Sequence, residues 1–227
     1  MSVKIIAIDG PAASGKSTIG RRLAEWLGFL YFDTGVMYRA VTLAAQKRGI
    51  EIEDEQAVSG LAETIRIDIT RPSVENGRSY DVLLNGEDVT KEIHLPGIDE
   101  YVSKISTYPG VRKALTDQQR RIGLQGEVVM VGRDIGTVVL PEADLKVYLE
   151  ASVEERAMRR YQEYIKRGES ASLEEIMDSM LNRDRIDSTR EIAPLRRAQD
   201  AVTINTDHLT VEEVVSRLKE LLVRDCD

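Results

Sequence analysis

Apolar residues gather in short runs along the chain, and the stretches between these runs carry apolar residues at helical spacing. Short, almost continuous apolar runs are typical of strands buried in a parallel sheet, and amphipathic stretches between them are typical of crossover helices. The predicted strands cover residues 3–8, 29–32, 128–131, 146–149 and 201–204. The pattern therefore predicts an α/β fold with a five-stranded parallel sheet and flanking helices.

One segment breaks this alternation. Three isoleucines occupy every second position of IRIDIT, and apolar alternation in SYDVLLNGEDVT leads to the turn pair Asn85 and Gly86. Such patterning is typical of antiparallel strands joined by a tight turn. We expect a small β insert at residues 63–96 in a single domain whose core covers residues 1–62 and 97–227. The insert is either peripheral or a cover for an acceptor that must be shielded from water.

The composition is that of a soluble globular protein, since 31% of the 227 residues are charged and 42% are hydrophobic. No uncharged apolar run reaches the roughly 18 residues that a membrane-spanning helix needs, and MSVKIIAIDG does not resemble a signal peptide. The net charge of -8 argues against binding to nucleic acid or anionic membranes. We expect a cytoplasmic monomer, in which the single cysteine, Cys226, forms neither an internal disulfide nor a CxxC metal site.

The stretch GPAASGKST follows the first predicted strand after Asp9 and has the spacing of a P-loop. In this motif, small residues let successive backbone N–H groups surround phosphate oxygens, and the lysine, here Lys16, reaches the β and γ phosphates. Apolar residues at helical spacing continue from Ile19 to Leu27, before Gly28 ends the predicted helix. The loop thus joins a strand to a helix N-terminus, which favours a bound anion.

Arginines follow two further predicted strands. FDTGVMYR places Asp33, Thr34 and Arg39 after the second strand, and VVMVGRDIGT places Arg133 and Asp134 after the third. Ligands of doubly wound sheets bind at the carboxyl ends of the strands, and a guanidinium can hold a phosphate through two parallel hydrogen bonds. Each arginine alone is typical of a surface ion pair, whereas both together, beside a P-loop, predict a second phosphate site.

A third group of charged residues lies in a predicted helical segment at residues 154–190. Three arginines in ASVEERAMRRY are spaced i, i+3 and i+4, so they share one helical face, and NRDRIDSTREIAPL adds more charge. The segment is either a solvated surface or a lid that excludes water and neutralises a transferred phosphoryl group. The residues concerned are Arg156, Arg159, Arg160, Arg183, Arg185, Asp187 and Arg190.

The combination of GPAASGKST, FDTGVMYR, STYPGVR, VGRDIGTVV, SVEERAMRR and NRDRIDSTREIAPL resembles the bacterial cytidylate kinase family, whose members phosphorylate CMP and dCMP with ATP. The resemblance covers nearly the whole chain, and its most specific parts are YRA after DTG and the GRDIGTVV segment. It implies a nucleoside monophosphate kinase fold with a five-stranded parallel core, an acceptor-binding insert and a helical lid. It also implies direct in-line transfer, with Mg²⁺ bridging the donor phosphates.

The resemblance further implies a set of site residues, carried over position by position. The ATP-binding loop would consist of Gly10, Pro11, Ala12, Ala13, Ser14, Gly15, Lys16, Ser17 and Thr18, with Lys16 catalytic and Ser17 near Mg²⁺. Catalytic lid residues would be Arg156, Arg159 and Arg160. The CMP phosphate would contact Arg39 and Arg133, with Thr34 nearby; the cytosine would contact Ser103, Arg112 and Asp134; and the ribose and phosphates would contact Arg183, Asp187 and Arg190.

Several alternatives stay open at this point. Some family members carry serine where Thr34 stands, and Ser103 precedes a Tyr-Pro-Gly turn, where a serine is often a local cap. Asp134 either reads the base or forms an ion pair with Arg133 or another arginine. The acceptor could be UMP, AMP or a non-nucleotide metabolite. A nucleotide-binding switch without transferase activity is a further alternative, although the guanine-reading NKxD motif is absent.

Overall fold

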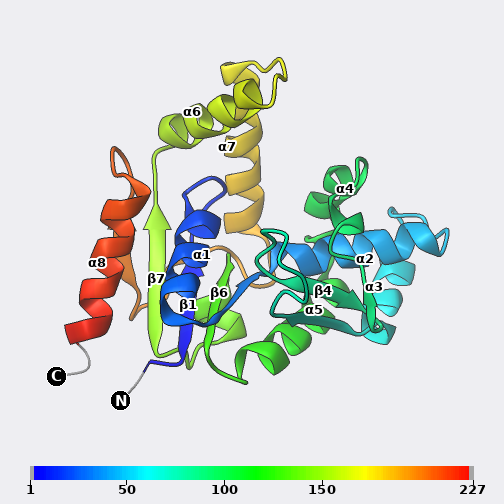
Figure 1. The fold of residues 1–227 in the computed structure, drawn as a ribbon. Coiled ribbons are helices and arrows are strands. Elements are labelled where there is room, and N and C mark those ends of the chain that lie inside the picture. Colours follow the sequence, from blue (N-terminus) through cyan, green and yellow to red (C-terminus); the bar gives the residue numbers. More distant parts are fainter. Residues whose placement is uncertain (1–2, 225–227) are drawn as a thin grey trace.

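The computed structural model describes residues 3–224, so Cys226 lies outside the described residues. Its main sheet has five parallel strands in the order β2-β6-β1-β7-β8, which confirms the predicted fold class (Figure 1). The strands are β1 (Ile5–Asp9), β2 (Leu30–Asp33), β6 (Val128–Gly132), β7 (Leu145–Glu150) and β8 (Val202–Asn205).

Alternating side chains of the sheet enter two hydrophobic clusters, one on each face. Ile6 and Ile8 of β1 pack with residues of α1 (Lys16–Leu27) and α8 (Val211–Arg224), whereas Ala7 between them faces the second cluster. The second cluster contains residues of α2 (Gly35–Lys47), α3 (Glu55–Thr64), α4 (Ile98–Ile105) and α5 (Pro109–Gly123). Because both faces are covered, each strand is apolar along most of its length, as the sequence pattern predicts.

The predicted antiparallel insert is present as a three-stranded sheet in the order β3-β4-β5. Its strands are β3 (Ile67–Thr70), β4 (Asp81–Leu84) and β5 (Glu87–Asp88). Asn85 and Gly86 form the turn between the last two, with φ angles of 52° and 88° that favour these residue types. Apolar side chains of β3 and β4 pack into the cluster shared with α2, which fixes the insert against the core.

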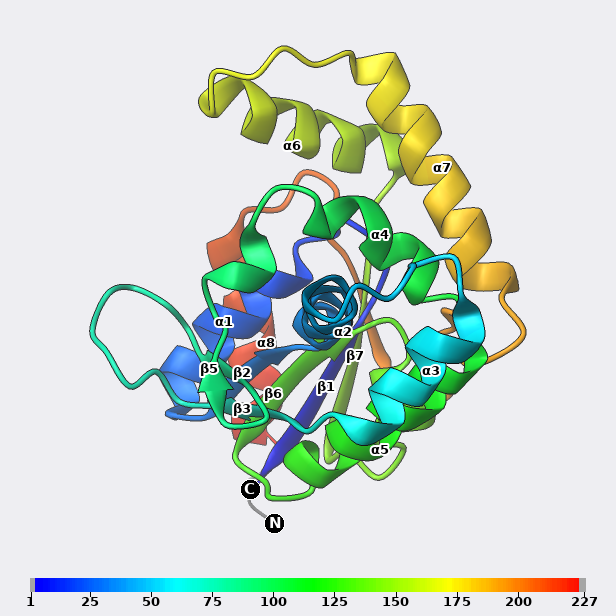
Figure 2. The same cartoon turned by 90° about the vertical axis from the view of Figure 1, so that its right-hand side faces the viewer.

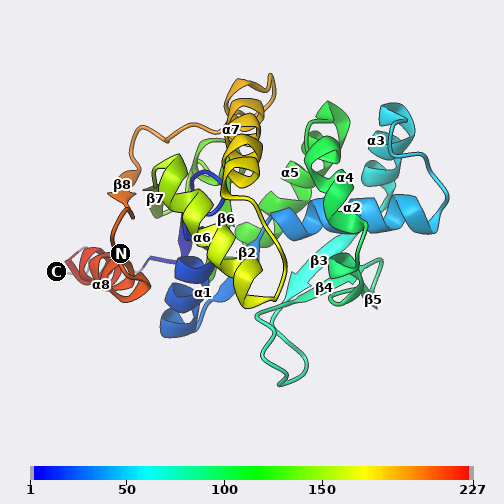
Figure 3. The same ribbon diagram turned by 90° about the horizontal axis from the view of Figure 1, so that it is seen from above.

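Two helices stand beyond the carboxyl edge of the main sheet. They are α6 (Val153–Lys166) and α7 (Leu173–Thr189), and they form a hairpin with its own small apolar cluster (Figures 2 and 3). Ser152 caps the start of α6, since its hydroxyl accepts a hydrogen bond from the Glu155 N–H at 3.2 Å. None of the helices in residues 3–224 is long and apolar enough to cross a membrane.

Candidate active site

The P-loop connects β1 to α1 and depends on its glycines. Gly10 has a φ of 150°, and a Cβ at this position would lie 2.2 Å from the carbonyl oxygen of Leu149. Gly15 precedes the helix with a φ of 91°, and no side chain caps the helix start. The first N–H groups of α1 are therefore available to an anion, as the motif predicts.

Lys16 lies folded over this loop. Its ammonium group donates to the carbonyl oxygen of Pro11 and lies 3.4 Å from the Ser14 hydroxyl. The side chain is buried, and burial, followed by the nearby charge of Arg133, lowers its pKa well below the usual lysine value. A phosphate anion beside Lys16 would offset both effects and favour its charged form.

Ser17 is bound to a carboxylate that the sequence-based site set omits. Its hydroxyl donates to Asp33 Oδ2 at 2.8 Å, and Asp33 Oδ1 accepts from the Gly35 N–H at 3.0 Å. Asp33 ends β2, so the main sheet brings the two residues together across 16 positions of sequence. A hydroxyl and a carboxylate next to a phosphate-binding loop are oxygen ligands of the kind that Mg²⁺ prefers.

A polar cleft of about 340 Å³ extends from the P-loop along the carboxyl ends of β2 and β6. Most of the residues predicted to bind CMP line it, and so do parts of α2, α5 and α7. Its lining holds seven cationic side chains and three carboxylates: Lys16, Arg39, Arg112, Arg133, Arg160, Arg183 and Arg190 against Asp33, Asp134 and Asp187. In a chain with a net charge of -8, this concentrates positive charge where an anionic ligand would bind.

Five of these side chains form one continuous network. Asp134 accepts from Arg112 at 2.8 Å and from Arg190 at 3.3 Å, not from Arg133. Arg190 also donates to Asp187 at 3.2 Å, and Asp187 accepts from Arg133 at 3.0 Å. These hydrogen bonds orient the three guanidinium groups around the cleft.

Arg112 has a second support in Tyr38. Its guanidinium carbon lies 5.9 Å from the centre of the Tyr38 ring, and both side chains are buried. Asp134 and Tyr38 help to raise the pKa of Arg112 despite its burial. The sequence gives no sign of this contact, because an aromatic residue inside an amphipathic helix usually belongs to the core.

Three other residues that are predicted to contact CMP lie outside this network. Arg39 lines the cleft and forms an ion pair with Asp99, whose side chain is 70% exposed. The hydroxyl of Thr34 is buried and donates to the Val131 carbonyl at 3.1 Å. Ser103 is exposed on α4 and lines a neighbouring hollow of about 500 Å³, so the structure does not bring it to Asp134.

A second hollow, of about 430 Å³, lies on the other side of the P-loop. It is bounded by α6 and by the segment that leads from β8 into α8, including Thr206 and Thr210. Four residues line both this hollow and the cleft: Ala13, Lys16, Ser17 and Arg160. Two ligands, one in each space, would therefore meet at Lys16.

The three lid arginines differ in their surroundings. Arg156 is buried and ties the hairpin to the core, because it donates to the Ala12 carbonyl at 3.3 Å and to Asp184 at 2.6 Å. Arg159 donates to the Thr206 carbonyl at 2.6 Å and so connects α6 with the end of β8. Only Arg160 borders both spaces.

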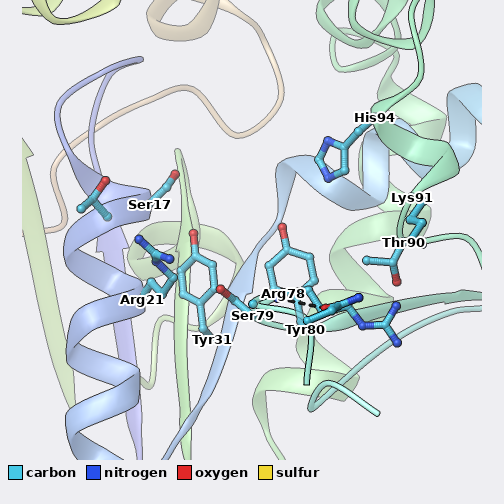
Figure 4. Close-up of a pocket in the computed structure, with 12 residues that line it drawn as sticks. Ser17, Arg21, Tyr31, Arg78, Ser79, Tyr80, Thr90, Lys91 and His94 are labelled. Carbon is cyan, nitrogen blue, oxygen red and sulfur yellow. Dashed lines mark hydrogen bonds between the residues drawn. The ribbon is translucent and has the colours of Figure 1, made fainter. Parts of the chain in front are cut away.

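A further hollow, of about 650 Å³, lies next to the cleft, between α1 and the insert. In Figure 4, Ser17, Arg21 and Tyr31 stand on one side of it, and Tyr80 and His94 stand on the other. Ser17, Tyr80 and His94 belong to the lining of the cleft as well. The hollow is therefore an open continuation of the cleft between core and insert.

The fold and the site together define a P-loop kinase: a P-loop at the carboxyl edge of a parallel sheet, with a cleft rich in cationic side chains beside it. The family model described as cytidylate kinase matches residues 6–224. A curated cytidylate kinase of Carboxydothermus hydrogenoformans is 48% identical over 222 residues, covering 98% of each protein. The chain belongs to the cytidylate kinase family and is a phosphotransferase.

The chain is also similar to a second curated relative and to a solved structure. A curated cytidylate kinase of Chloroflexus aggregans is 51% identical over 211 residues, which is 93% of this chain and 90% of that protein. Among solved structures, a shikimate kinase from Acinetobacter baumannii in complex with shikimate covers 99% of this chain and 95% of its own, at 17% identity and a TM-score of 0.49.

Proposed function

We propose that this protein phosphorylates CMP and dCMP with ATP by direct in-line transfer. The observation that carries the proposal is the meeting of two spaces at Lys16 and Arg160, one against α8 and one ending at Asp134 with its two arginines. ATP in the first and CMP in the second would place donor and acceptor phosphates on either side of one cluster of positive charge. The relatives named cytidylate kinase support the same reaction.

On this proposal, the P-loop N–H groups and Lys16 hold the donor phosphates, while Arg39, Arg133 and Arg183 hold the acceptor phosphate. The attacking atom is a phosphate oxygen, which is largely ionised at neutral pH, so no protein base is required. The chain's contribution is to align the two phosphates and to neutralise the charge of the transferred group. Arg160, at the junction, is the lid arginine best placed for the second task.

Mg²⁺ would be held by Ser17 and Asp33 together with the donor phosphates. When bound, it would neutralise charge on the phosphate oxygens during transfer. The residues present fit this ion, because Mg²⁺ in kinases uses one or two carboxylates and completes its shell with phosphates and water. Residues 3–224 contain no cluster of three or more His, Cys, Asp or Glu side chains that could hold a metal by themselves.

The acceptor base would be read by Asp134. Cytosine carries an amino donor where uracil carries a carbonyl oxygen, and a carboxylate can only accept. Asp187 and Arg190 would lie toward the ribose and phosphates, next to the base-reading pair. Ser103 would reach the base only in a form of the protein in which α4 lies closer to the cleft.

A coupled assay with ATP and a panel of CMP, dCMP, UMP and AMP tests the function. We expect CMP and dCMP to have the highest kcat/KM. A higher value for UMP or AMP would assign a different acceptor, and no turnover with any of them would favour a nucleotide-binding switch. The remaining parts of the proposal are the cytoplasmic location, the monomeric state, and the division into core, insert (63–96) and lid (154–190).

A further inference from the structure

Asp9 is the last residue of β1 before the P-loop, and its buried carboxylate accepts hydrogen bonds from backbone N–H groups that follow β6. Its Oδ1 accepts from the Ile135 N–H at 2.8 Å, and its Oδ2 accepts from the Gly136 N–H at 2.7 Å. These two residues directly follow Arg133 and Asp134 in the chain. They begin η2 (Ile135–Val139), a single π-helical turn whose first N–H groups need acceptors outside the turn.

The Asp9 carboxylate lies where the pairing of β1 with β6 ends. The parallel ladder between β1 and β6 runs up to the pair Asp9 and Gly132. Beyond this pair, β1 leads into the P-loop, and β6 leads into residues 133–136, which we call the acceptor loop. A Cβ at Gly136 would lie 3.4 Å from Asp9 Oδ2 and 3.2 Å from the Lys146 side chain. The loop at Gly136 is therefore in contact with both the Asp9 carboxylate and the Lys146 side chain.

We propose that Asp9 is a positioning residue that fixes the acceptor loop relative to the P-loop, so that Arg133 and Asp134 meet the acceptor in line with the donor phosphates. The inference rests on the proposed function. Asp9 is one peptide bond from the P-loop and two hydrogen bonds from the loop that carries the acceptor-binding pair. One side chain thus connects the donor half of the site to the acceptor half.

The charge state of Asp9 supplies a specific signature. The pKa of Asp9 is raised to about 6: burial, and to a smaller extent Asp134, raise it, whereas the two N–H groups and Lys16 lower it. From β7, Tyr148 faces the same carboxyl group, while the ammonium of Lys146 is bound to Asp200. The ionised carboxylate accepts from both N–H groups, whereas a protonated one turns an O–H toward one of them. Asp9 therefore accepts both hydrogen bonds above about pH 6, and these bonds are weakened below that pH.

The test compares Asp9→Asn with Asp144→Asn, a control that is matched in its two N–H bonds but lies in an exposed position. Asp144 also binds two N–H groups of the β1 segment, those of Lys4 and Ile5 at 2.9 and 2.8 Å, but at the other end of the strand. At pH 8 we expect Asp9→Asn to raise the KM for CMP about tenfold or more, because a hydrogen bond to a charged group is lost. The KM for ATP should change much less, and the control should change neither constant.

The pH profile separates positioning from a general folding defect. The CMP phosphate itself ionises near pH 6, so the readout is the ratio of the two enzymes' KM values for CMP, in which that ionisation cancels. We expect the ratio of Asp9→Asn to wild type to fall toward one as the pH is lowered from 8 to 5. A ratio that is independent of pH, or an equal rise in both KM values, would overturn the inference.

A second variant keeps the test decisive if Asp9→Asn does not fold. Asp9→Glu retains a carboxylate but adds one methylene group, which moves its oxygens away from the positions that accept from the Ile135 and Gly136 N–H groups. It should raise the KM for CMP while ATP binding is retained, and an unchanged KM would refute the positioning role. If the wild-type protein does not turn over CMP at all, it is the proposed function that fails; if it does and both variants behave normally, only this inference fails.

Discussion

The substitution Asp134→Asn tests the part of the site on which the choice of CMP depends. Asp134 lies between Arg112 and Arg190 at 2.8 and 3.3 Å, and the three side chains are 10%, 3% and 8% exposed. Asparagine has the same shape but no charge, and it keeps only one accepting oxygen. The change therefore removes the shared counter-charge of two almost buried guanidinium groups.

The size of the stability effect follows from this burial. Removing one partner of a buried ion pair costs about 3–5 kcal/mol, because the other charge remains buried. Because asparagine still accepts one hydrogen bond, we expect the lower end of that range, about 3 kcal/mol. For a chain of 227 residues, such a loss lowers Tm by roughly 6–12 °C.

The effect on specificity is measured as kcat/KM for CMP and UMP in a coupled assay, alongside thermal unfolding. The asparagine amide can turn either a donor or an acceptor toward the base, so CMP should lose efficiency while UMP holds or gains. We expect the CMP to UMP ratio to narrow at least about tenfold, which corresponds to about 1.4 kcal/mol. An unchanged ratio with a lower Tm would show that Asp134 only holds its two arginines. An unchanged Tm would refute the account of the buried network.

The remaining predictions concern single charged side chains. Lys16→Ala should lower kcat several hundredfold, since one such donor is worth about 3–4 kcal/mol in the transition state; half the activity at saturating ATP would contradict this. Arg39→Lys should weaken CMP far more than ATP in titrations, because lysine lacks the bidentate fork, and equal losses would indicate a folding defect instead. Arg160→Gln should lower kcat with little change in Tm, because its ion pair with Glu163 is exposed to solvent. Arg156→Gln should instead lower Tm, because the buried Arg156 guanidinium pairs with the partly buried Asp184; the opposite result in kinetics and thermal unfolding would reverse these roles.

The pattern of residues along the chain was sufficient to predict the strands and turns of the fold, because the preferences that define them act over a few residues. In β1, Ile6 and Ile8 enter one cluster and Ala7 enters the other, so an uninterrupted apolar run is what a strand covered on both faces requires. The Asn85 and Gly86 turn was predicted for the same reason, since their left-handed backbone is a property of these two residue types. The P-loop also follows from local rules, because its glycines and Lys16 lie within a few positions of one another.

The surroundings of the site depend on contacts that no local pattern contains. Helical spacing predicted that Arg156, Arg159 and Arg160 share a face of α6, but it could not tell that Arg156 is buried against the P-loop while Arg160 borders both spaces. Periodicity gives a direction around a helix axis and not the identity of the neighbour. That identity is decided when the hairpin packs against the core.

The sequence by itself determined the sheet, the P-loop and the residue types that follow each strand. Only the tertiary structure decided that Asp134 pairs with Arg112 and Arg190 rather than with its neighbour Arg133, and that Asp9 binds N–H groups 126 and 127 positions away. The physical reason is that buried charges require partners, and the partner is whichever group the packed strands and helices bring within hydrogen-bonding distance.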